Sequence, residues 1–110
     1  MELVKCNQIK ELSKNKLLDD VSYLEVSICG TINEIRQIPT KLNPNKFLRF
    51  ITFEDETGVI DCVCFDKQIK KFDKLLQPNN KVIITGEKFL DNEDYPETTP
   101  IIIQNVKLVK

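Results

Sequence analysis

Cationic and aromatic side chains concentrate in one stretch of the sequence. Four cations fall within fourteen residues, and the overlapping segment 47–54 (FLRFITFE) contains three phenylalanines. The four cations are Arg36, Lys41, Lys46 and Arg49. Cations hold phosphate groups by charge, and aromatic rings stack on nucleobases. The stretch therefore has the chemistry to hold a single-stranded nucleic acid. An ordinary solvated loop is the alternative interpretation, because charge runs usually face water.

Residue types that carry catalysis are sparse. The chain has no histidine and three glycines, and it lacks both a G-x-S-x-G nucleophile motif and a phosphate-cradling glycine loop. The clustered acids Asp91, Glu93, Asp94 and Glu97 lack the spacing of a calcium loop. We therefore expect a binding protein and not an enzyme, with no metal ion and no cofactor.

The cysteines do not form a metal-binding pattern. Cys6, Cys29, Cys62 and Cys64 include no C-x-x-C pair, and there is no histidine to join them around zinc. Cys62 and Cys64 lie two apart in a strand-like run and share one face. We interpret the cysteines as small buried hydrophobic residues, with disulfide or redox roles as the alternative.

Length, composition and charge favour one globular domain. The 110 residues are 41% hydrophobic and 30% charged, and the net charge is −1. Because phosphate neutralisation drives non-specific binding, a nucleic-acid site must depend on a local patch or on stacking. No apolar run approaches the roughly 18 residues of a membrane span. The N-terminus lacks the apolar core of a signal peptide, so we expect a cytoplasmic location.

The apolar pattern predicts five strands and a helix after a polar N-terminal segment. Strand-like alternation or β-branched and aromatic runs occupy residues 21–37, 47–54, 59–65, 81–90 and 99–109. Residues 66–77 change to a helical period, with Asp66 as the expected N-cap. Residues 1–20 predict a short helix near Asn7 or a linker. Residues 37–46, which contain two prolines, predict a loop.

Two strands lose their alternation part-way along. Ile35 is out of phase with the stripe that ends at Ile32, and the phase slips again near Gln104. Glycine inside a strand often marks a bulge or a tight barrel corner. We therefore expect a bend at Gly30 and a bulge near Gln104.

This element order predicts the fold. Five strands with a helix between the third and fourth form an all-β OB-fold Greek-key barrel. We assign residues 21–110 to the barrel and residues 1–20 to the N-terminal helix or linker. The usual ligand surface of such a barrel is the face of strands 2 and 3, with the loops between strands 1 and 2 and between strands 4 and 5.

Asp61 orients the hairpin of strands 2 and 3. Burying an unpaired carboxylate is costly, so Ile60, Cys62 and Cys64 should face the interior, and Asp61 and Val63 the outside. On the preceding strand, Phe50 shares a face with Leu48 and Thr52, and Arg49 has the opposite phase. Since Arg49 also favours solvent, the residues alone leave open whether Phe50 faces a ligand or the core.

Nearly the whole chain resembles the OB domain near the C-terminal end of bacterial DNA polymerase III alpha subunits. The resemblance covers about residues 20–109. Its matching residues are CGTI at 29–32 with Arg36, FITFEDETGVID at 50–61 with Phe65, and VIITG at 82–86. It implies binding of single-stranded template DNA near a replicase active site, by a binding domain of a replication or repair protein that can be part of a DNA polymerase. The acidic segment at 91–97 departs from that pattern.

The E-D-x-T-G-x-I stretch is also similar to that of class II synthetase anticodon-binding domains and archaeal single-strand-binding proteins. The resemblance to synthetase domains implies that Phe50 lies on the ligand face. Arg49, near the strand end, would then snorkel outward. Tyr95, in the loop between the last two strands, is a second stacking candidate, with covering of the barrel end as its alternative role.

We therefore expect a nucleic-acid surface on the hairpin and its flanking loops. The candidate residues are Arg36, Lys41, Lys46, Arg49, Phe50, Thr52, Asp61, Val63 and Tyr95. The expected partner is single-stranded DNA, with RNA or tRNA as an alternative. A protein-interaction module of a replication complex is the other alternative, with an apolar strip formed by Leu48, Phe50 and Val63. The lysines of segment 66–77 are expected only to favour solubility.

Overall fold

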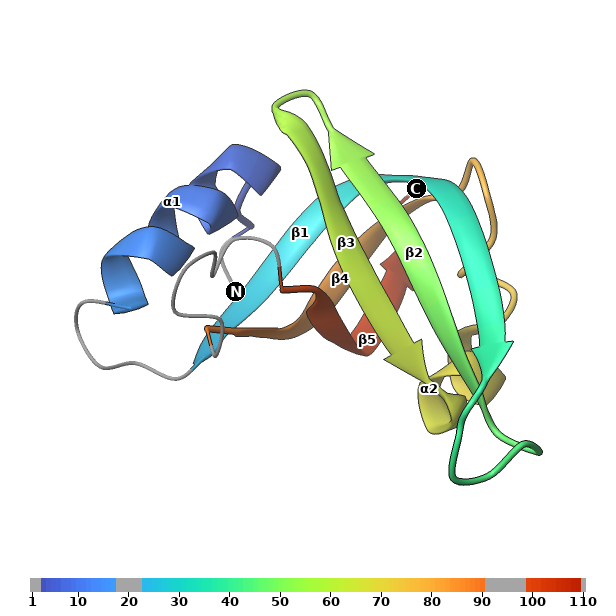
Figure 1. The fold of residues 1–110 in the computed structure, drawn as a ribbon. Helices are drawn as coiled ribbons and strands as arrows, with labels where there is room; N and C mark the ends of the chain where they lie inside the picture. The colour runs from blue at the N-terminus through green and yellow to red at the C-terminus, as the bar shows by residue number, and fades with distance from the viewer. Residues whose placement is uncertain (1–2, 18–22, 91–98, 110) are drawn as a thin grey trace.

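The strands close into a barrel, as the sequence predicts (Figure 1). The computed structural model describes residues 3–17, 23–90 and 99–109. Within them the barrel order is β1-β2-β3-β5-β4, with β3 and β5 parallel and the other pairs antiparallel. The strands are β1 (Tyr23–Pro39), β2 (Phe47–Asp55), β3 (Gly58–Phe65), β4 (Lys81–Phe89) and β5 (Ile101–Leu108). The helices are α1 (Cys6–Leu17) and α2 (Asp66–Phe72).

The long strand β1 serves two neighbours because it bends. Residues 23–31 pair with β4, and residues 31–39 pair with β2. A side chain at Gly30 would collide with the carbonyl oxygen of Glu54 and the ring of Phe53, so this corner requires glycine. The pairing with β2 shifts register between Ile32 and Glu34, which accounts for the off-phase Ile35. The strand continues to Pro39, beyond its predicted end.

The predicted bulge in β5 is confirmed at Gln104. Thr85 of β4 faces Asn105, and the next residue, Gly86, faces Ile103. Gln104 is thus the extra residue on β5. Its exposure, between the buried Ile103 and the buried Val106, explains why the alternation slips there.

The core is formed by the inward phase of every strand. It includes Ile60, Cys62 and Cys64, so the predicted orientation of β3 is confirmed. Burial raises the pKa of the Cys64 thiol to about 11 and that of Cys6, which also faces the Asp55 carboxylate, to about 11. Burial also raises the pKa of Cys62. All four cysteines are free, and Cys29 is half-buried. The three fully buried thiols therefore pack as small hydrophobic groups.

Helix α2 is shorter than predicted. It ends at Phe72, and residues 73–79 form turns, although Leu76 still packs in the core. Side chains instead donate hydrogen bonds to the backbone carbonyl groups of this segment. Arg49 donates to the Leu76 carbonyl, and Asn80 donates to the carbonyls of Lys74 and Leu75. This early end could not be predicted from the helical period of residues 66–77.

Asp66 does not have its predicted capping role. Phe65 occupies the N-cap position, and Asp66 is the first helical residue. Its carboxylate pairs with Lys70 at 3.0 Å and accepts a hydrogen bond from the backbone N–H of Phe47 at 3.1 Å. These interactions, with the Lys70 hydrogen bond the strongest, hold the pKa of Asp66 below its usual value. The carboxylate therefore joins α2 to the start of β2.

The N-terminal helix begins at Cys6 and is capped by the β2–β3 turn. The N–H of Cys6 donates to Asp55 Oδ2 at 2.9 Å, and the N–H of Asn7 donates to Thr57 Oγ1 at 3.1 Å. Cys6 and Ile9 belong to the barrel core. Figure 1 shows α1 and α2 at opposite ends of the molecule. Among the described residues, no helix is long and apolar enough to cross a membrane.

Candidate nucleic-acid interface

Three strands share an outer face on which side chains align in rows. The rows follow from the register of β1 with β2 and of β2 with β3. From one end of the face to the other, they are an apolar row of Ile38, Leu48 and Phe65, a platform row of Arg36, Phe50 and Val63, and a polar row of Glu34, Thr52 and Asp61. Cross-strand neighbours on one face lie close enough for their side chains to interact.

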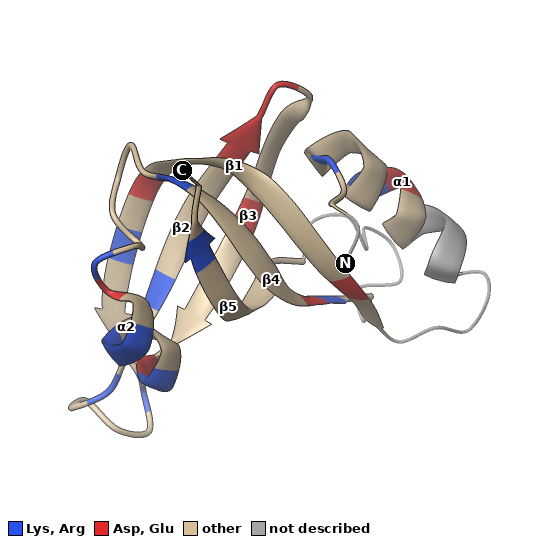
Figure 2. Cartoon of the chain, turned by 180° about the vertical axis from the view of Figure 1, so that it is seen from behind, with Lys and Arg blue, Asp and Glu red and all other residues tan. Residues whose placement is uncertain are grey.

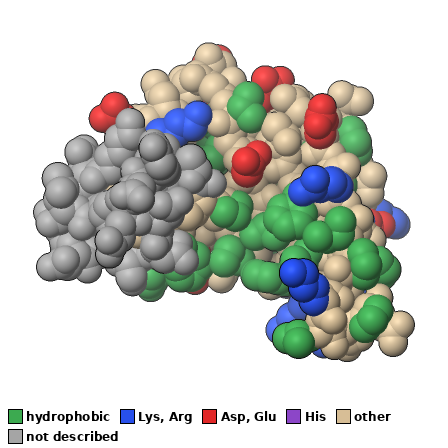
Figure 3. Space-filling view, viewed as in Figure 1, with side chains coloured by type: hydrophobic (Ala, Val, Ile, Leu, Met, Phe, Trp, Pro, Cys, Tyr) green, Lys and Arg blue, Asp and Glu red, His purple; other side chains and the backbone are tan. Residues whose placement is uncertain are grey.

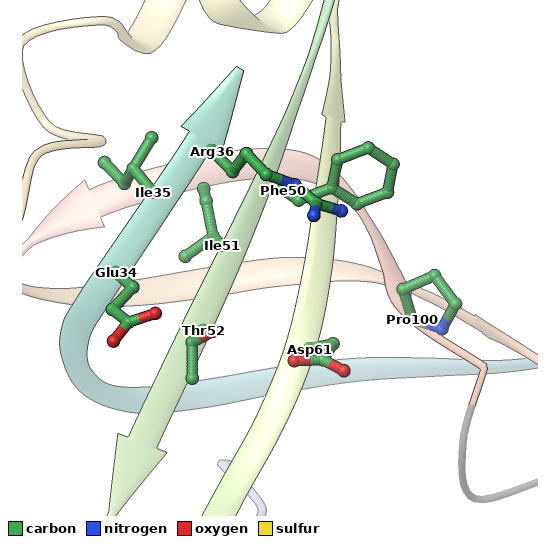
Figure 4. Close-up of a pocket in the computed structure, with 8 residues that line it drawn as sticks. All are labelled: Glu34, Ile35, Arg36, Phe50, Ile51, Thr52, Asp61 and Pro100. Atoms are coloured by element: carbon green, nitrogen blue, oxygen red, sulfur yellow. The ribbon is translucent and has the colours of Figure 1, made fainter. Parts of the chain in front are cut away.

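The platform and polar rows form a groove of about 390 Å³ (Figure 4). Its lining residues are Glu34, Ile35, Arg36, Phe50, Ile51, Thr52, Asp61 and Pro100. Pro100 precedes β5 and forms the far wall. The groove has the size of a small ligand site and combines an apolar floor with a few polar groups.

Phe50 is half-buried on the outer face. Ile51 and Phe53, its neighbours of opposite phase, are fully buried, so the alternative that Phe50 is a core residue is wrong. The guanidinium carbon of Arg36 lies 5.4 Å from the centre of the Phe50 ring, a cation–π arrangement. The pair places an aromatic surface next to a positive charge.

In the part of the chain that the structure describes, hydrogen bonds and ion pairs do not hold the polar side chains of the groove. Within the described residues, Glu34, Thr52 and Asp61 form no side-chain hydrogen bond or ion pair, and Arg36 makes only its contact with Phe50. Glu34, Arg36 and Asp61 are exposed. Their hydrogen-bonding capacity therefore remains open to a ligand.

The family follows from a comparison with known domains. Residues 26–109 match the model of a family described as the OB-fold nucleic acid binding domain. The chain belongs to this family. No curated protein matches the chain at a significant level. The family assignment agrees with the closed barrel and with an open groove on the outer face of the hairpin.

Solved structures share the fold of this OB domain. A crystal structure of yeast Stn1 and Ten1 matches with a TM-score of 0.63 and 20% identity, over 96% of this chain and 60% of that chain. The OB domain thus spans 60% of the length of that yeast chain. The second OB-fold domain of replication protein A from Methanococcus maripaludis matches with a TM-score of 0.55 and 13% identity, over 79% and 85% of the two chains.

A third structure is the mitochondrial single-stranded DNA binding protein Rim1 of S. cerevisiae. It matches with a TM-score of 0.55 and 17% identity, over 82% of the OB domain and 97% of that chain. At these identities the likeness establishes the fold.

Arg49 does not reach outward as expected. It is 7% exposed and lies on the inner phase of β2. Its Nη2 donates to Asp73 Oδ1 at 2.7 Å and to Gln37 Oε1 at 2.7 Å, and its Nη1 donates to the Leu76 carbonyl at 3.1 Å. The segment after α2 supplies Asp73 and the Leu76 carbonyl, and β1 supplies Gln37. The prediction that Arg49 snorkels into solvent is therefore wrong.

Val63 shares the platform row but is only 6% exposed. Phe50 lies opposite it on β2, and Ile102 lies opposite it on β5. Because it lies between these two neighbours and is almost fully buried, Val63 offers little surface of its own. Thr52 and Asp61 lie in the groove with Phe50 and Arg36, so the structure brings these four predicted residues together.

The predicted loop cations lie at one end of the barrel. Lys41 and Lys46 are exposed in the segment between β1 and β2. Figure 2 shows the basic residues of this segment and of α2 at the same end of the molecule. The β2–β3 turn at the other end carries Glu54, Asp55 and Glu56. A molecule with a net charge of −1 thus has a basic end next to the apolar row, beyond which the platform row lies.

Phe65 is a candidate contact that the sequence analysis missed. It is 45% exposed in the apolar row, diagonal to Phe50. Figure 3 shows hydrophobic surface on this side of the molecule with basic side chains beside it. The alternation along β3 could have identified it, because Phe65 lies on the same face of the strand as Asp61 and Val63. Glu34 and Pro100 were also missed, whereas the predicted Tyr95 and the acids at 91–97 lie outside the described residues.

Proposed function

We propose that this OB domain binds single-stranded DNA as a module of a replication or repair protein and performs no catalysis itself. The observation that carries the proposal is the outward Phe50 ring, with Arg36 over it, in a groove whose polar groups have no partner among the described residues. A base stacked on an aromatic side chain contributes about 1–3 kcal/mol.

The rows of the outer face suit an extended strand. A base on Phe50 would have the polar row at one side and the apolar row at the other. Diagonal neighbours across two strands are about 7–8 Å apart, so Phe65 can support a neighbouring nucleotide. Arg36, Lys41 and Lys46 can hold the phosphates by charge.

The comparisons support this proposal at the level of fold and family. The family description names nucleic acid binding, and two of the similar structures are a domain of replication protein A and a single-stranded DNA binding protein. The finer assignment to a polymerase III alpha subunit depends on the sequence motif alone. A cytoplasmic location likewise remains a proposal.

Fluorescence anisotropy with labelled oligonucleotides tests the function. Thymidine 12-mers should bind at low salt, and the affinity should fall steeply as salt rises. Absence of binding at about 1 mM protein would contradict the proposal, because non-specific affinities are typically tighter than that. A matched uridine 12-mer separates DNA binding from the RNA alternative, since tighter binding of RNA would favour an RNA or tRNA ligand.

A protein-interaction role is the second candidate. Ile38 is 38% exposed, Phe65 is 45% exposed, and Leu42 in the adjoining loop is fully exposed. An apolar strip of this kind can bind a partner. Sedimentation that depends on concentration, with no change on adding oligonucleotide, would favour this role. Chemical-shift mapping across residues 36–65 distinguishes the two roles, because an oligonucleotide should shift resonances of the platform and polar rows only if it binds there.

A further inference from the structure

The groove contains carboxylates where a nucleic-acid backbone would be repelled. Glu34 and Asp61 flank Thr52 in the polar row, next to the Phe50 platform. Both carboxylates are exposed, and neither has a hydrogen-bond or ion-pair partner in the described part of the chain. Since phosphates carry negative charge, the group that fits this side of the groove is a hydrogen-bond donor on a base edge.

A carboxylate distinguishes the bases by their donors. It accepts hydrogen bonds at two oxygens and donates none when ionised. The pairing edge of guanine offers two adjacent donors, the ring N1–H and the N2 amino group. Adenine and cytosine offer one amino group beside an acceptor nitrogen, and thymine offers one N–H between two carbonyl groups. Guanine is therefore the base that can form a bidentate pair with a carboxylate at its exposed edge.

Asp61 is the better placed of the two carboxylates. Figure 4 shows the Phe50 ring, Asp61 and Pro100 on the same side of the groove, while Glu34 lies on the β1 side with Ile35. The aspartate side chain is also shorter than that of glutamate and loses less rotamer entropy on binding. A guanine stacked between the Phe50 ring and the Pro100 wall would meet Asp61 at its edge.

We propose that Asp61 makes this groove selective for guanine, by accepting hydrogen bonds from N1–H and the N2 amino group of a base stacked on Phe50. The proposal rests on the proposed function, because it assigns a base preference to the same groove.

Competition binding with a thymidine 12-mer that carries one central variable base tests the proposal. We expect a central guanine to bind about tenfold more tightly than thymine, adenine or cytosine, as a bidentate pair allows. Hypoxanthine, which lacks the N2 amino group, should fall between guanine and thymine. D61N should remove the preference, and E25Q, an exposed acid on the part of β1 that pairs with β4, should retain it.

The outcomes separate the proposal from the function on which it rests. Equal affinity for all four bases, or a preference that survives in D61N, would overturn the guanine assignment while DNA binding stands. A uniform rise in affinity in D61N would also overturn it, because that result reflects charge alone. If the Asp61 amide resonance shifts with an arginine-rich peptide but not with the guanine oligonucleotide, the groove binds a protein side chain instead. Failure of every oligonucleotide to bind would contradict the proposed function itself.

Discussion

At the tip of the β2–β3 hairpin, Asp55 accepts hydrogen bonds from the backbone N–H of Cys6 and from the N–H and hydroxyl of Thr57. In the groove of the same hairpin, Asp61 has no such partner among the described residues. The two arginines divide in the same way, because Arg49 is enclosed by acceptors, whereas within the described ranges Arg36 contacts only the Phe50 ring. Residues of one type thus hold the fold together in one region and face solvent beside an aromatic ring in the other.

This difference separates structural from ligand-binding roles. A side chain whose hydrogen bonds are all made within the chain contributes to folding, and its removal leaves unsatisfied groups. A side chain with open hydrogen-bonding capacity contributes little to folding and can contribute to binding. Variants of the first kind should change stability, and variants of the second kind should change affinity.

The largest effect is expected from R49M. Removing the guanidinium breaks the hydrogen bonds to Gln37, Asp73 and Leu76, so the free energy of unfolding should fall by about 3 kcal/mol. Urea unfolding measures this loss. R49K, which keeps the charge but not the planar fork, should recover only part of it. Unchanged stability of R49M, with weaker oligonucleotide binding, would place Arg49 among the phosphate contacts after all.

Removal of the aromatic platform should act on affinity alone. F50A is expected to weaken binding of the thymidine 12-mer about tenfold, through loss of base stacking, with a small change in melting temperature. The matched control is Y23A, which removes an aromatic residue that is 42% exposed on the part of β1 that pairs with β4. Equal losses of affinity in F50A and Y23A would indicate a general effect and would show that Phe50 is not part of the binding site.

Loss of the α1 cap should have a smaller effect on stability. D55A leaves the N–H of Cys6 without its acceptor, and we expect a loss of about 1 kcal/mol. E56Q, which breaks the exposed pair with Lys5, should cost less than that. Thermal unfolding of both variants at neutral pH measures the difference. If D55A were as stable as E56Q, the Asp55 cap would contribute nothing beyond an exposed ion pair.

The same carboxylate predicts a pH dependence. Partial burial of Asp55 opposes ionisation, but the hydrogen bonds from Thr57 and Cys6 outweigh it, and the pKa lies below its ordinary value. Its contribution to stability is therefore complete above pH of about 4, the unfolded value, and is lost as pH falls through the lower folded value. Melting temperatures between pH 7 and pH 3 should fall less in D55A than in the unaltered chain. Parallel curves would contradict this prediction.

The smallest effect is expected at Arg36. R36Q should weaken oligonucleotide binding about threefold at moderate salt and reduce the slope of log affinity against log salt by about one. Its stability should match that of the unaltered chain, in contrast with R49M. K107Q, at an exposed lysine of β5, is the control that should keep the full slope. An unaltered salt slope in R36Q would show that Arg36 makes no phosphate contact.

The sequence predicts the barrel because its evidence is periodic. Alternation identifies the strands, and each break in it, at Ile35 and at Gln104, coincides with a register shift in the sheet. The same parity argument places Asp61 outward and the alternating cysteines of β3 inward. These features depend on the local geometry of a strand, and the alternation of apolar and polar residues in that strand indicates this geometry directly.

The roles of individual polar residues could not be predicted in the same way. Arg49 is buried because the segment after α2 supplies acceptors, and Asp55 is a cap because α1 begins beside the hairpin turn. Both facts depend on contacts between segments far apart in the sequence. The resemblance correctly favoured an outward Phe50, but the motif E-D-x-T-G that helps to carry it forms a helix cap in this chain, away from the groove.

The hairpin is anchored at both ends, by its turn to α1 and by the start of β2 to α2. The floor of the groove is therefore preorganised, and little ordering of the protein backbone remains to be done when a strand arrives. Association should then proceed in a single kinetic phase, at a rate governed by diffusion and by charge.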